Sequence, residues 1–314
     1  MNRLLSDVES SPSRSIHLIA VLQAVLVTFL WSTSWVLIKF GLRDIPALTF
    51  AGLRYSLAFL FLLPLILQKP HRSLLRDLPK TAWLRMGALG LLFYAVTQGS
   101  QFLGLFYLPA ITVSLLLNFT TLIVAVLGIF LLGEKLTPVR WLGLFCLLAG
   151  VWAFFYPVTL PGLEILGLAI VSVGVLANAL SAILGRSINR QGEIPPIVVT
   201  TISMGIGAGI LLLSGLLIQG MPVLDLQSWG IILWLSLVNT AFAFTLWNLT
   251  LRTLSAVESS IINNTMLIQI ALLAWIFLGE SLTTQQVIGM LLVLIGTLVV
   301  QIRDGIAFHK IRTR

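Results

Sequence analysis

Amide side chains recur inside the long apolar runs of this 314-residue chain. Polar residues at membrane depth are costly, so they are candidates for function by default. An amide both donates and accepts hydrogen bonds, which suits an uncharged or zwitterionic solute. Amides can equally serve as hydrogen-bonding contacts between helices, and the sequence leaves both roles open for each residue. The candidates for a solute-binding site are Gln98, Gln101, Asn118, Asn178 and Asn264.

The first apolar run carries an aromatic stripe. Trp31, Trp35 and Lys39 stand four residues apart, so a helix places them on one side. Trp31 lies fifteen residues beyond Ile16, too deep for an interfacial belt, and we expect it to line a cavity. Trp35 and Lys39 fit either that cavity and its outer mouth or an interfacial belt with a snorkelling lysine. Trp247, in a later run, is a further candidate because aromatic faces hold apolar groups or an ammonium.

Charged residues within the runs are rare, and Arg54 is the clearest case. It follows Pro46 by eight residues, which is about 12 Å of helical rise. Such an arginine must face protein or water, where it can bind an anionic solute or tie its helix to carbonyls or to a connector glutamate. All eleven acidic residues fall in tails, connectors or helix ends. Without a carboxylate at membrane depth, a proton-driven exporter of lipophilic cations is disfavoured.

The composition is that of a membrane protein. Hydrophobic residues make up 58% of the chain and charged residues 10%, whereas soluble domains carry roughly 25% charged residues. The net charge of +8 resides in connectors and tails, which argues against nucleic acid as a partner. The one cysteine, Cys146, excludes a disulfide framework, and the three histidines lack metal-ligand spacing. The sequence has no phosphate-binding loop either, so we expect no cofactor and no metal.

Ten apolar segments have about the 20 residues that a helix needs to cross a bilayer. They do not alternate as the strands of a membrane barrel do, and prolines mark several starts. The sequence therefore predicts an all-α membrane protein with ten transmembrane helices. The expected spans are Ile16–Phe40, Pro46–Leu67, Trp83–Phe106, Pro109–Leu132, Pro138–Tyr156, Leu163–Ser187, Pro195–Ile218, Ser228–Thr250, Ala256–Leu278 and Thr284–Ile302.

The basic residues predict the orientation of these helices. With a cytoplasmic N-terminus, sixteen of the nineteen lysines and arginines fall in cytoplasmic segments and two fall outside. This bias is the positive-inside pattern of helical membrane proteins. We expect a multi-pass protein in the lipid bilayer of the cell's inner membrane, with both termini in the cytoplasm.

A short motif recurs at the middle and near the end of the chain. Gly133–Thr137 reads Gly-Glu-Lys-Leu-Thr, and Gly279–Thr283, 146 residues later, reads Gly-Glu-Ser-Leu-Thr. Each half then holds five helices, an odd number, so the halves must face opposite sides of the membrane. The loss of Lys135 from the second copy agrees with that inversion. Glu134 and Glu280 each follow a glycine at a helix end and precede a helix start, so we expect both to be structural caps.

The chain divides accordingly into two repeats and two tails. We expect a disordered cytoplasmic lead over residues 1–15 and a basic cytoplasmic tail over 303–314. The five-helix repeats are expected over 16–157 and 163–302. Glycines seven residues apart in the fifth and tenth helices predict close packing, either with a neighbouring helix or in a dimer. Monomer and homodimer therefore both stay open.

These features resemble those of the EamA-type branch of the drug/metabolite transporter superfamily. The resemblance covers about residues 16–302, and it implies inverted five-plus-five bundles that move amino acids or other small metabolites, often outward. It rests on the paired Gly-Glu-x-Leu-Thr connectors, on Trp31-Ser32-x-x-Trp35-x-x-x-Lys39, and on Pro46 and Arg54.

Two departures from the family pattern are visible, and the resemblance also bears on Arg54. Ser32 replaces a glycine that is frequent in the family, and no proline lies midway along the fourth and ninth helices, which argues against a pronounced kink there. Because the resemblance implies an arginine at this place for varied substrates, a structural role for Arg54 is slightly favoured.

The first hypothesis for function is an inner-membrane transporter of a small uncharged or zwitterionic metabolite, such as an amino acid. It would move its substrate outward by alternating access between the two halves, with the site near the bilayer midplane. The alternative is a transporter of an anionic metabolite that uses Arg54 and Lys39. A membrane enzyme would need paired acid–base or nucleophilic groups, and a sensor would need a soluble output domain; the sequence indicates neither.

Overall fold

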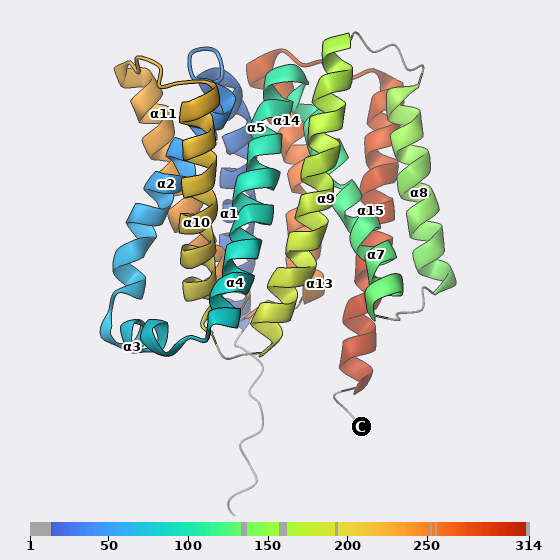
Figure 1. Cartoon of the computed structure of the whole chain (residues 1–314). Helices are drawn as coiled ribbons and strands as arrows, with labels where there is room; N and C mark the ends of the chain where they lie inside the picture. Colours follow the sequence, from blue (N-terminus) through green and yellow to red (C-terminus); the bar gives the residue numbers. More distant parts are fainter. Residues whose placement is uncertain are drawn as a thin grey trace, which may run out of the picture.

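Long helices packed side by side make up the protein (Figure 1). This computed structural model describes residues 14–132, 137–156, 162–191, 194–251, 253–254 and 256–311, and every regular element within them is helical. The first half holds α1 (Arg14–Gly41), α2 (Ala47–Ile66), α3 (Lys69–Asp77), α4 (Lys80–Leu89), η1 (Gly90–Thr97), α5 (Gln98–Tyr107), α6 (Ala110–Leu117), α7 (Phe119–Leu132) and α8 (Pro138–Phe155). The second half holds α9 (Gly162–Gln191), α10 (Pro196–Ile218), α11 (Leu226–Ser236), η2 (Leu237–Phe242), α12 (Ala243–Thr250), α13 (Ala256–Asn264), α14 (Met266–Leu278) and α15 (Thr284–Ile311).

Each of the ten predicted spans coincides with one helix or with a run of consecutive helices. Within the described residues, seven helical segments are long and apolar enough to cross a membrane. Three shorter apolar helices, Ala110–Val124, Trp141–Phe155 and Thr284–Val300, occupy the other predicted places. An all-helical, multi-pass membrane fold is therefore confirmed for the described residues, whereas the count of ten spans stays a prediction.

Prolines begin helices where the sequence predicts it. Pro46, Pro109 and Pro195 immediately precede α2, α6 and α10 with φ angles of −58°, −56° and −57°. Pro138 is the first residue of α8. The ring of proline holds φ near the helical value, and its missing N–H costs nothing at a helix start, where no carbonyl could accept it.

Between α2 and α4 lies a short helix, α3, that the pattern of apolar spans does not predict. Its nine residues are too few and too polar to span a membrane, and it lies across one end of the bundle. Leu74 and Leu75 pack against a buried cluster that includes Ile188 of α9 and Val198 of α10, while Arg72 is exposed. Packing against other helices therefore stabilises a helix that is short and polar on its own.

Glycines allow α8 and α15 to pack closely. A Cβ atom added to Gly150 would lie 2.6 Å from the carbonyl oxygen of Gly289, and one added to Gly143 would lie 3.0 Å from that of Gly296. Higher residue numbers on one helix meet lower numbers on the other, so α8 and α15 run antiparallel. Of the two predicted uses of these glycines, the structure shows packing with a neighbouring helix of the same chain.

The helices α2 and α10 are paired in the same way. A Cβ atom on Gly52 would lie 2.4 Å from the Cα atom of Leu212, and one on Gly215 would lie 2.5 Å from the backbone nitrogen of Thr49. These two helices are therefore also antiparallel and in close backbone contact. Both closely packed pairs join helices that correspond to each other in the two halves.

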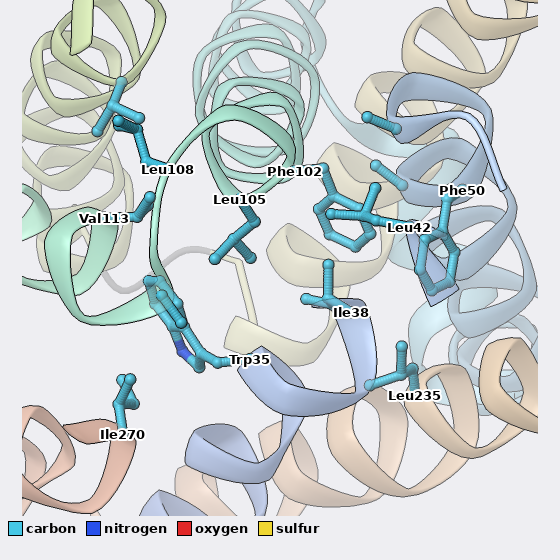
Figure 2. Close-up of a cluster of buried hydrophobic side chains, with 14 of the residues drawn as sticks. Trp35, Ile38, Leu42, Phe50, Phe102, Leu105, Leu108, Val113, Leu235 and Ile270 are labelled. Carbon is cyan, nitrogen blue, oxygen red and sulfur yellow. The ribbon is translucent and has the colours of Figure 1, made fainter. Parts of the chain in front are cut away.

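A large apolar core holds the remaining helices together (Figure 2). Trp35 of α1 belongs to this core together with Leu105 of α5, Leu235 of α11 and Ile270 of α14. Phe50 of α2 meets Phe102 of α5 edge to face, with ring centres 5.1 Å apart, and both are completely buried. Edge-to-face contact places the positive rim of one ring against the negative face of the other. This core fixes the relative positions of α1, α2 and α5, which border the cavity described next.

Candidate functional site

A polar cavity of about 420 Å³ lies among side chains from both halves of the chain. This volume is within the range of small-molecule sites. Arg54 is its one charged member among the described residues, and no described carboxylate borders it. The cavity is lined by Trp31, Ser34, Trp35, Arg54, Tyr55, Phe93, Gln98, Gln101, Ser114, Leu117, Asn118, Thr120, Thr121, Asn178, Phe244, Asn263, Asn264, Met266, Leu267 and Ile270.

Two helices are interrupted where they border this cavity. Asn118 separates α6 from α7, and Thr265 separates α13 from α14. The N–H of Asn118 donates to the carbonyl of Leu115 at 3.1 Å, and that of Thr265 donates to the carbonyl of Ile262 at 3.1 Å. Both bonds span three residues in place of the four of an α-helix. The two breaks lie at corresponding places in the two halves, to within one residue.

Side-chain hydrogen bonds accompany both breaks. Asn118 Nδ2 donates to the carbonyl of Ser114 at 2.8 Å, and Thr265 Oγ1 donates to that of Ile262 at 2.6 Å. Such short side chains compete with the backbone for its carbonyls. Neither place has a proline, so no pronounced kink was expected, yet both helices are interrupted. Each break is a tightened turn whose backbone stays in the right-handed helical region, with φ and ψ of −66° and −20° at Asn118 and of −62° and −20° at Thr265.

Two π-helical turns, η1 and η2, also occupy corresponding places in the two halves. Thr97 Oγ1 donates to the carbonyl of Leu92, and Thr240 Oγ1 donates to that of Leu235, both at 2.8 Å and five residues back. A π-turn is wider than an α-turn and so shifts the residues that follow around the helix axis. In a regular α-helix, Tyr94 and Gln98, four residues apart, would lie on the same face. In η1, Phe93 lines the cavity beside Gln98.

Arg54 is held at the cavity wall by neighbours from three helices. Its side chain is 4% exposed, and its Nε donates to Thr240 Oγ1 at 3.1 Å. The guanidinium carbon lies 5.1 Å from the centre of the Tyr55 ring and 6.0 Å from that of Phe102. The hydrogen bond to Thr240 agrees in part with a structural role for Arg54, because it ties α2 to η2. The acceptor, however, is a hydroxyl and neither a carbonyl nor a glutamate. Its position at the wall leaves the anion-binding interpretation open.

The amides at the wall are oriented by hydrogen bonds to other side chains. Tyr55 donates its phenolic hydrogen to Gln98 Oε1 at 2.6 Å, and Asn178 Nδ2 donates to Thr120 Oγ1 at 3.1 Å. Because the Gln98 oxygen is engaged, its amide nitrogen is the part of the group that can donate to a solute. In the same way, the engaged nitrogen of Asn178 leaves its oxygen as an acceptor.

Most of the predicted site residues meet at this cavity, and two do not. Trp31, Trp35, Gln98, Gln101, Asn118, Asn178, Asn264 and Arg54 line it; their roles in binding stay predictions. Trp247 is not among the lining residues, but its ring centre lies 5.3 Å from that of Trp31, which is. Lys39 is half-buried near the end of α1 and lies outside the lining. The predicted roles of Trp247 and Lys39 in binding therefore stay predictions, although neither residue is part of this lining.

The repeated connector motif has a structural role in its second copy. Gly279 ends α14 in the left-handed conformation, with φ of 68°, which favours glycine because it has no side chain. The chain then turns so that the carboxylate of Glu280 accepts from the N–H of Ala110 at 2.7 Å and of Ile111 at 3.1 Å. Glu280 thus caps α6 of the other half, where capping of the next helix in sequence was expected. Glu134 lies outside the described residues.

Three aromatic residues of the wall were not predicted from the sequence. Tyr55 could have been predicted, because it directly follows Arg54 in the sequence and a residue beside a buried charge is a candidate for the same site. Phe93 depends on the π-turn η1, which single-sequence patterns do not reveal. Phe244 of α12 packs against Trp31 with ring centres 5.3 Å apart, and nothing in its apolar surroundings distinguishes it in the sequence.

The fold and the cavity define a multi-pass helical membrane protein with an internal polar site, and comparison with known proteins agrees. The model of the EamA-like transporter family matches the chain twice, over residues 18–156 and 165–302. The chain therefore belongs to the EamA-like transporter family. Members of this family are transporters and not enzymes.

Individual relatives are distant but cover nearly the whole chain. The uncharacterized transporter YoaV of Bacillus subtilis is 25% identical over 283 residues, which are 88% of this chain and 94% of that protein. An uncharacterized transporter of Archaeoglobus fulgidus is 28% identical over 283 residues, covering 89% and 97%. A probable amino-acid metabolite efflux pump of Salmonella typhimurium is 25% identical over 283 residues, covering 87% and 91%. One solved crystal structure has the same fold, with a TM-score of 0.65 at 18% identity, over 91% of this chain and 98% of that one.

Proposed function

We propose that this protein exports a small metabolite, such as an amino acid, across the inner membrane by alternating access between two inverted halves. The observation that carries the proposal is the polar cavity, which both halves line and which two interrupted helices border. Interrupted helices at a site between repeats are a recurring design of secondary transporters. The efflux-pump relative supports a substrate of the amino-acid type, although its identity is only 25%.

The inversion of the two halves is supported by the direction of corresponding helices. In a parallel repeat, corresponding helices such as α8 and α15 would run the same way. Here α8 and α15 are antiparallel, and so are α2 and α10. The matched π-turns and helix breaks extend this correspondence to the elements around the cavity. Alternating access then requires the two halves to rock about the site, first toward one side and then toward the other.

The proposed orientation has both termini in the cytoplasm, with ten spans. It is supported by the bias of basic residues and by their positions in the fold. Figure 1 shows α3, which carries Lys69, Arg72 and Arg76, at the same end of the bundle as the end of α15. Positively charged segments favour the cytoplasmic side. We leave monomer and homodimer as alternatives, since the glycine faces of α8 and α15 already pack on each other.

The proposed site is tested by removing one amide at a time. Asn118→Ala and Asn264→Ala each remove a side chain from the cavity wall, and Asn189→Ala removes an exposed amide at the end of α9 as a control. A hydrogen bond to a solute is worth about 0.5–1.5 kcal/mol, so each cavity variant should transport its substrate about two- to tenfold more slowly. The measurement is uptake into proteoliposomes over an amino-acid panel, with and without a pH gradient.

Thermal unfolding of the same samples shows whether each variant is folded. The control variant should transport at the parental rate. Parental rates for both cavity variants with every transported solute would assign Asn118 and Asn264 to helix packing and would remove the proposed site. A parent protein that transports no amino acid of the panel would overturn the amino-acid part of the proposal.

A further inference from the structure

A buried positive charge that has no counter-ion among the described residues borders the cavity. Arg54 is 4% exposed, and no described carboxylate lines the cavity with it. The hydrogen bond from its Nε to Thr240 has a neutral hydroxyl as its acceptor. From this arrangement we infer that the cavity binds solutes through a carboxylate group that pairs with Arg54, and that an amino group on the solute is dispensable. This inference rests on the proposed function and names the chemical class of its substrate.

The cost of burial is the first reason. An arginine at membrane depth is expensive unless it is paired or hydrated, and proteins normally supply a partner for it. Among the described residues the partners of Arg54 are one hydroxyl and two aromatic rings. These contacts do not neutralise the charge. A carboxylate that enters the cavity would neutralise it, and two charge-assisted hydrogen bonds to the guanidinium would offset the solvation that the carboxylate loses.

The second reason is that the guanidinium is already oriented. Thr240 engages Nε, and the rings of Tyr55 and Phe102 lie within 6.0 Å of the guanidinium carbon. The edge that carries the two terminal nitrogens is then the part of the group that remains for a ligand. That edge binds the two oxygens of a carboxylate side by side, and a group held in place beforehand loses little entropy on binding.

The third reason is that the cavity wall near Arg54 offers hydrogen-bond donors but no described carboxylate. The oxygen of Gln98 is engaged by Tyr55, so its amide presents N–H groups. A carboxylate can satisfy such donors. An ammonium would find neutral acceptors such as the Asn178 oxygen, but no described carboxylate.

The substrate class that follows is small monocarboxylates with an apolar side chain. The aromatic and aliphatic part of the lining, including Phe93, Phe244 and Ile270, suits such a side chain. Amino acids belong to this class through their carboxylate. Their deaminated analogues should bind about as well, whereas their amides, which keep the amino group, should not.

The test uses two series of four compounds with the same side chain and different head groups. The isobutyl series is leucine, 4-methylpentanoate, leucinamide and 4-methylpentanamide. The benzyl series is phenylalanine, 3-phenylpropanoate, phenylalaninamide and 3-phenylpropanamide. Binding to the purified full-length protein is measured from the ligand-induced rise of the unfolding temperature at constant ionic strength. In at least one series, the two carboxylates should bind about tenfold or more tightly than the two amides, because a charge-assisted bond contributes about 1.5–3 kcal/mol.

Variants of Arg54 show whether this residue is the cause. Arg54→Gln should abolish the preference for carboxylates, and Arg54→Lys should keep part of it because the charge remains. Arg43→Gln removes an equal charge from an exposed connector and should bind like the parent. The ligand series on the parent protein tests the inference even where Arg54→Gln does not fold.

Equal binding of amides and carboxylates, or binding of none of the eight compounds, would overturn the inference. So would a carboxylate preference that survives in folded Arg54→Gln. Uptake into proteoliposomes separates this failure from failure of the proposed function. Transport of acids and amides at equal rates would remove the carboxylate site and leave a transporter, whereas binding of acids without transport would remove the transport proposal and leave the site.

Discussion

Replacing Glu280 with glutamine should weaken the link between α14 and α6. The two carboxylate oxygens accept from the N–H groups of Ala110 and Ile111, at 2.7 and 3.1 Å. Glutamine has one acceptor oxygen and turns an NH₂ group toward the second N–H. It also loses the negative charge that the helix N-terminus favours, worth about 0.3–1 kcal/mol. Capping changes cost about 0.5–2 kcal/mol, so Glu280→Gln should destabilise the protein by about 1–2 kcal/mol.

The assay is thermal unfolding of the purified protein beside transport by the same variant. A loss of this size should lower the unfolding temperature by about 2–6 °C. Because Glu280 does not line the cavity, the order in which solutes compete for transport should not change, although the rate can fall. Asp77→Asn is the control, since Asp77 is an exposed carboxylate at the end of α3. A surface substitution of this kind contributes little, so the control should shift the unfolding temperature by about 1 °C or less.

Two results would refute this reasoning about Glu280. An unfolding temperature equal to that of the parent would show that the cap contributes nothing to stability. A changed order of competing solutes would instead place Glu280 in the substrate site. Glu280→Ala, which removes both acceptors, should destabilise the protein more than Glu280→Gln does; the reverse order would also contradict a capping role.

Two further predictions concern topology and packing. In a Cys146→Ser background, an impermeant maleimide added to intact cells should label a single cysteine placed at Ser281 and spare one at Gln68; labelling at Gln68 would contradict the proposed orientation. Gly150→Ala should destabilise the protein by about 1–3 kcal/mol, because the new Cβ atom would lie 2.6 Å from a backbone oxygen of α15. Gly87→Ala, with open space around it, should be neutral or slightly stabilising, and equal unfolding temperatures for the two variants would refute the packing argument.

The helices themselves could be predicted because their cause is local. Backbone groups in a bilayer must pair within their own segment, so a long apolar run is sufficient to indicate a helix. Pro46, Pro109 and Pro195 then mark helix starts because their φ angle and missing N–H act on their own neighbours. By contrast, α3 is short and polar, and it depends on the contacts of Leu74 and Leu75 with other helices. A proline at its start is a local signal of the same kind, but α3 has no long apolar run to accompany it.

The depth of a residue in the membrane could be predicted from its position along its helix. The side of the helix on which its side chain lies could not be predicted. Gln98, Asn118 and Asn264 lie at the cavity as predicted from their polarity and depth. Trp247 was expected beside them at similar depth, yet it packs on Trp31 and is not among the lining residues. The π-turn η2 directly precedes α12, which carries Trp247, and an extra residue in a turn rotates the residues that follow it. Periodicity with 3.6 residues per turn cannot anticipate such a shift.

The sequence by itself determined the class of this protein: an all-helical membrane chain with two similar halves, a membrane interior nearly without carboxylates, and amides at depth. These properties follow from composition and from spacing along one chain. Only the tertiary structure decided which groups meet across helices. It brings Glu280 to the start of α6 and leaves Arg54 at a cavity wall without a described carboxylate nearby. The physical reason is that hydrogen bonds and ion pairs act over a few ångströms in space, between residues that can be more than a hundred positions apart in sequence.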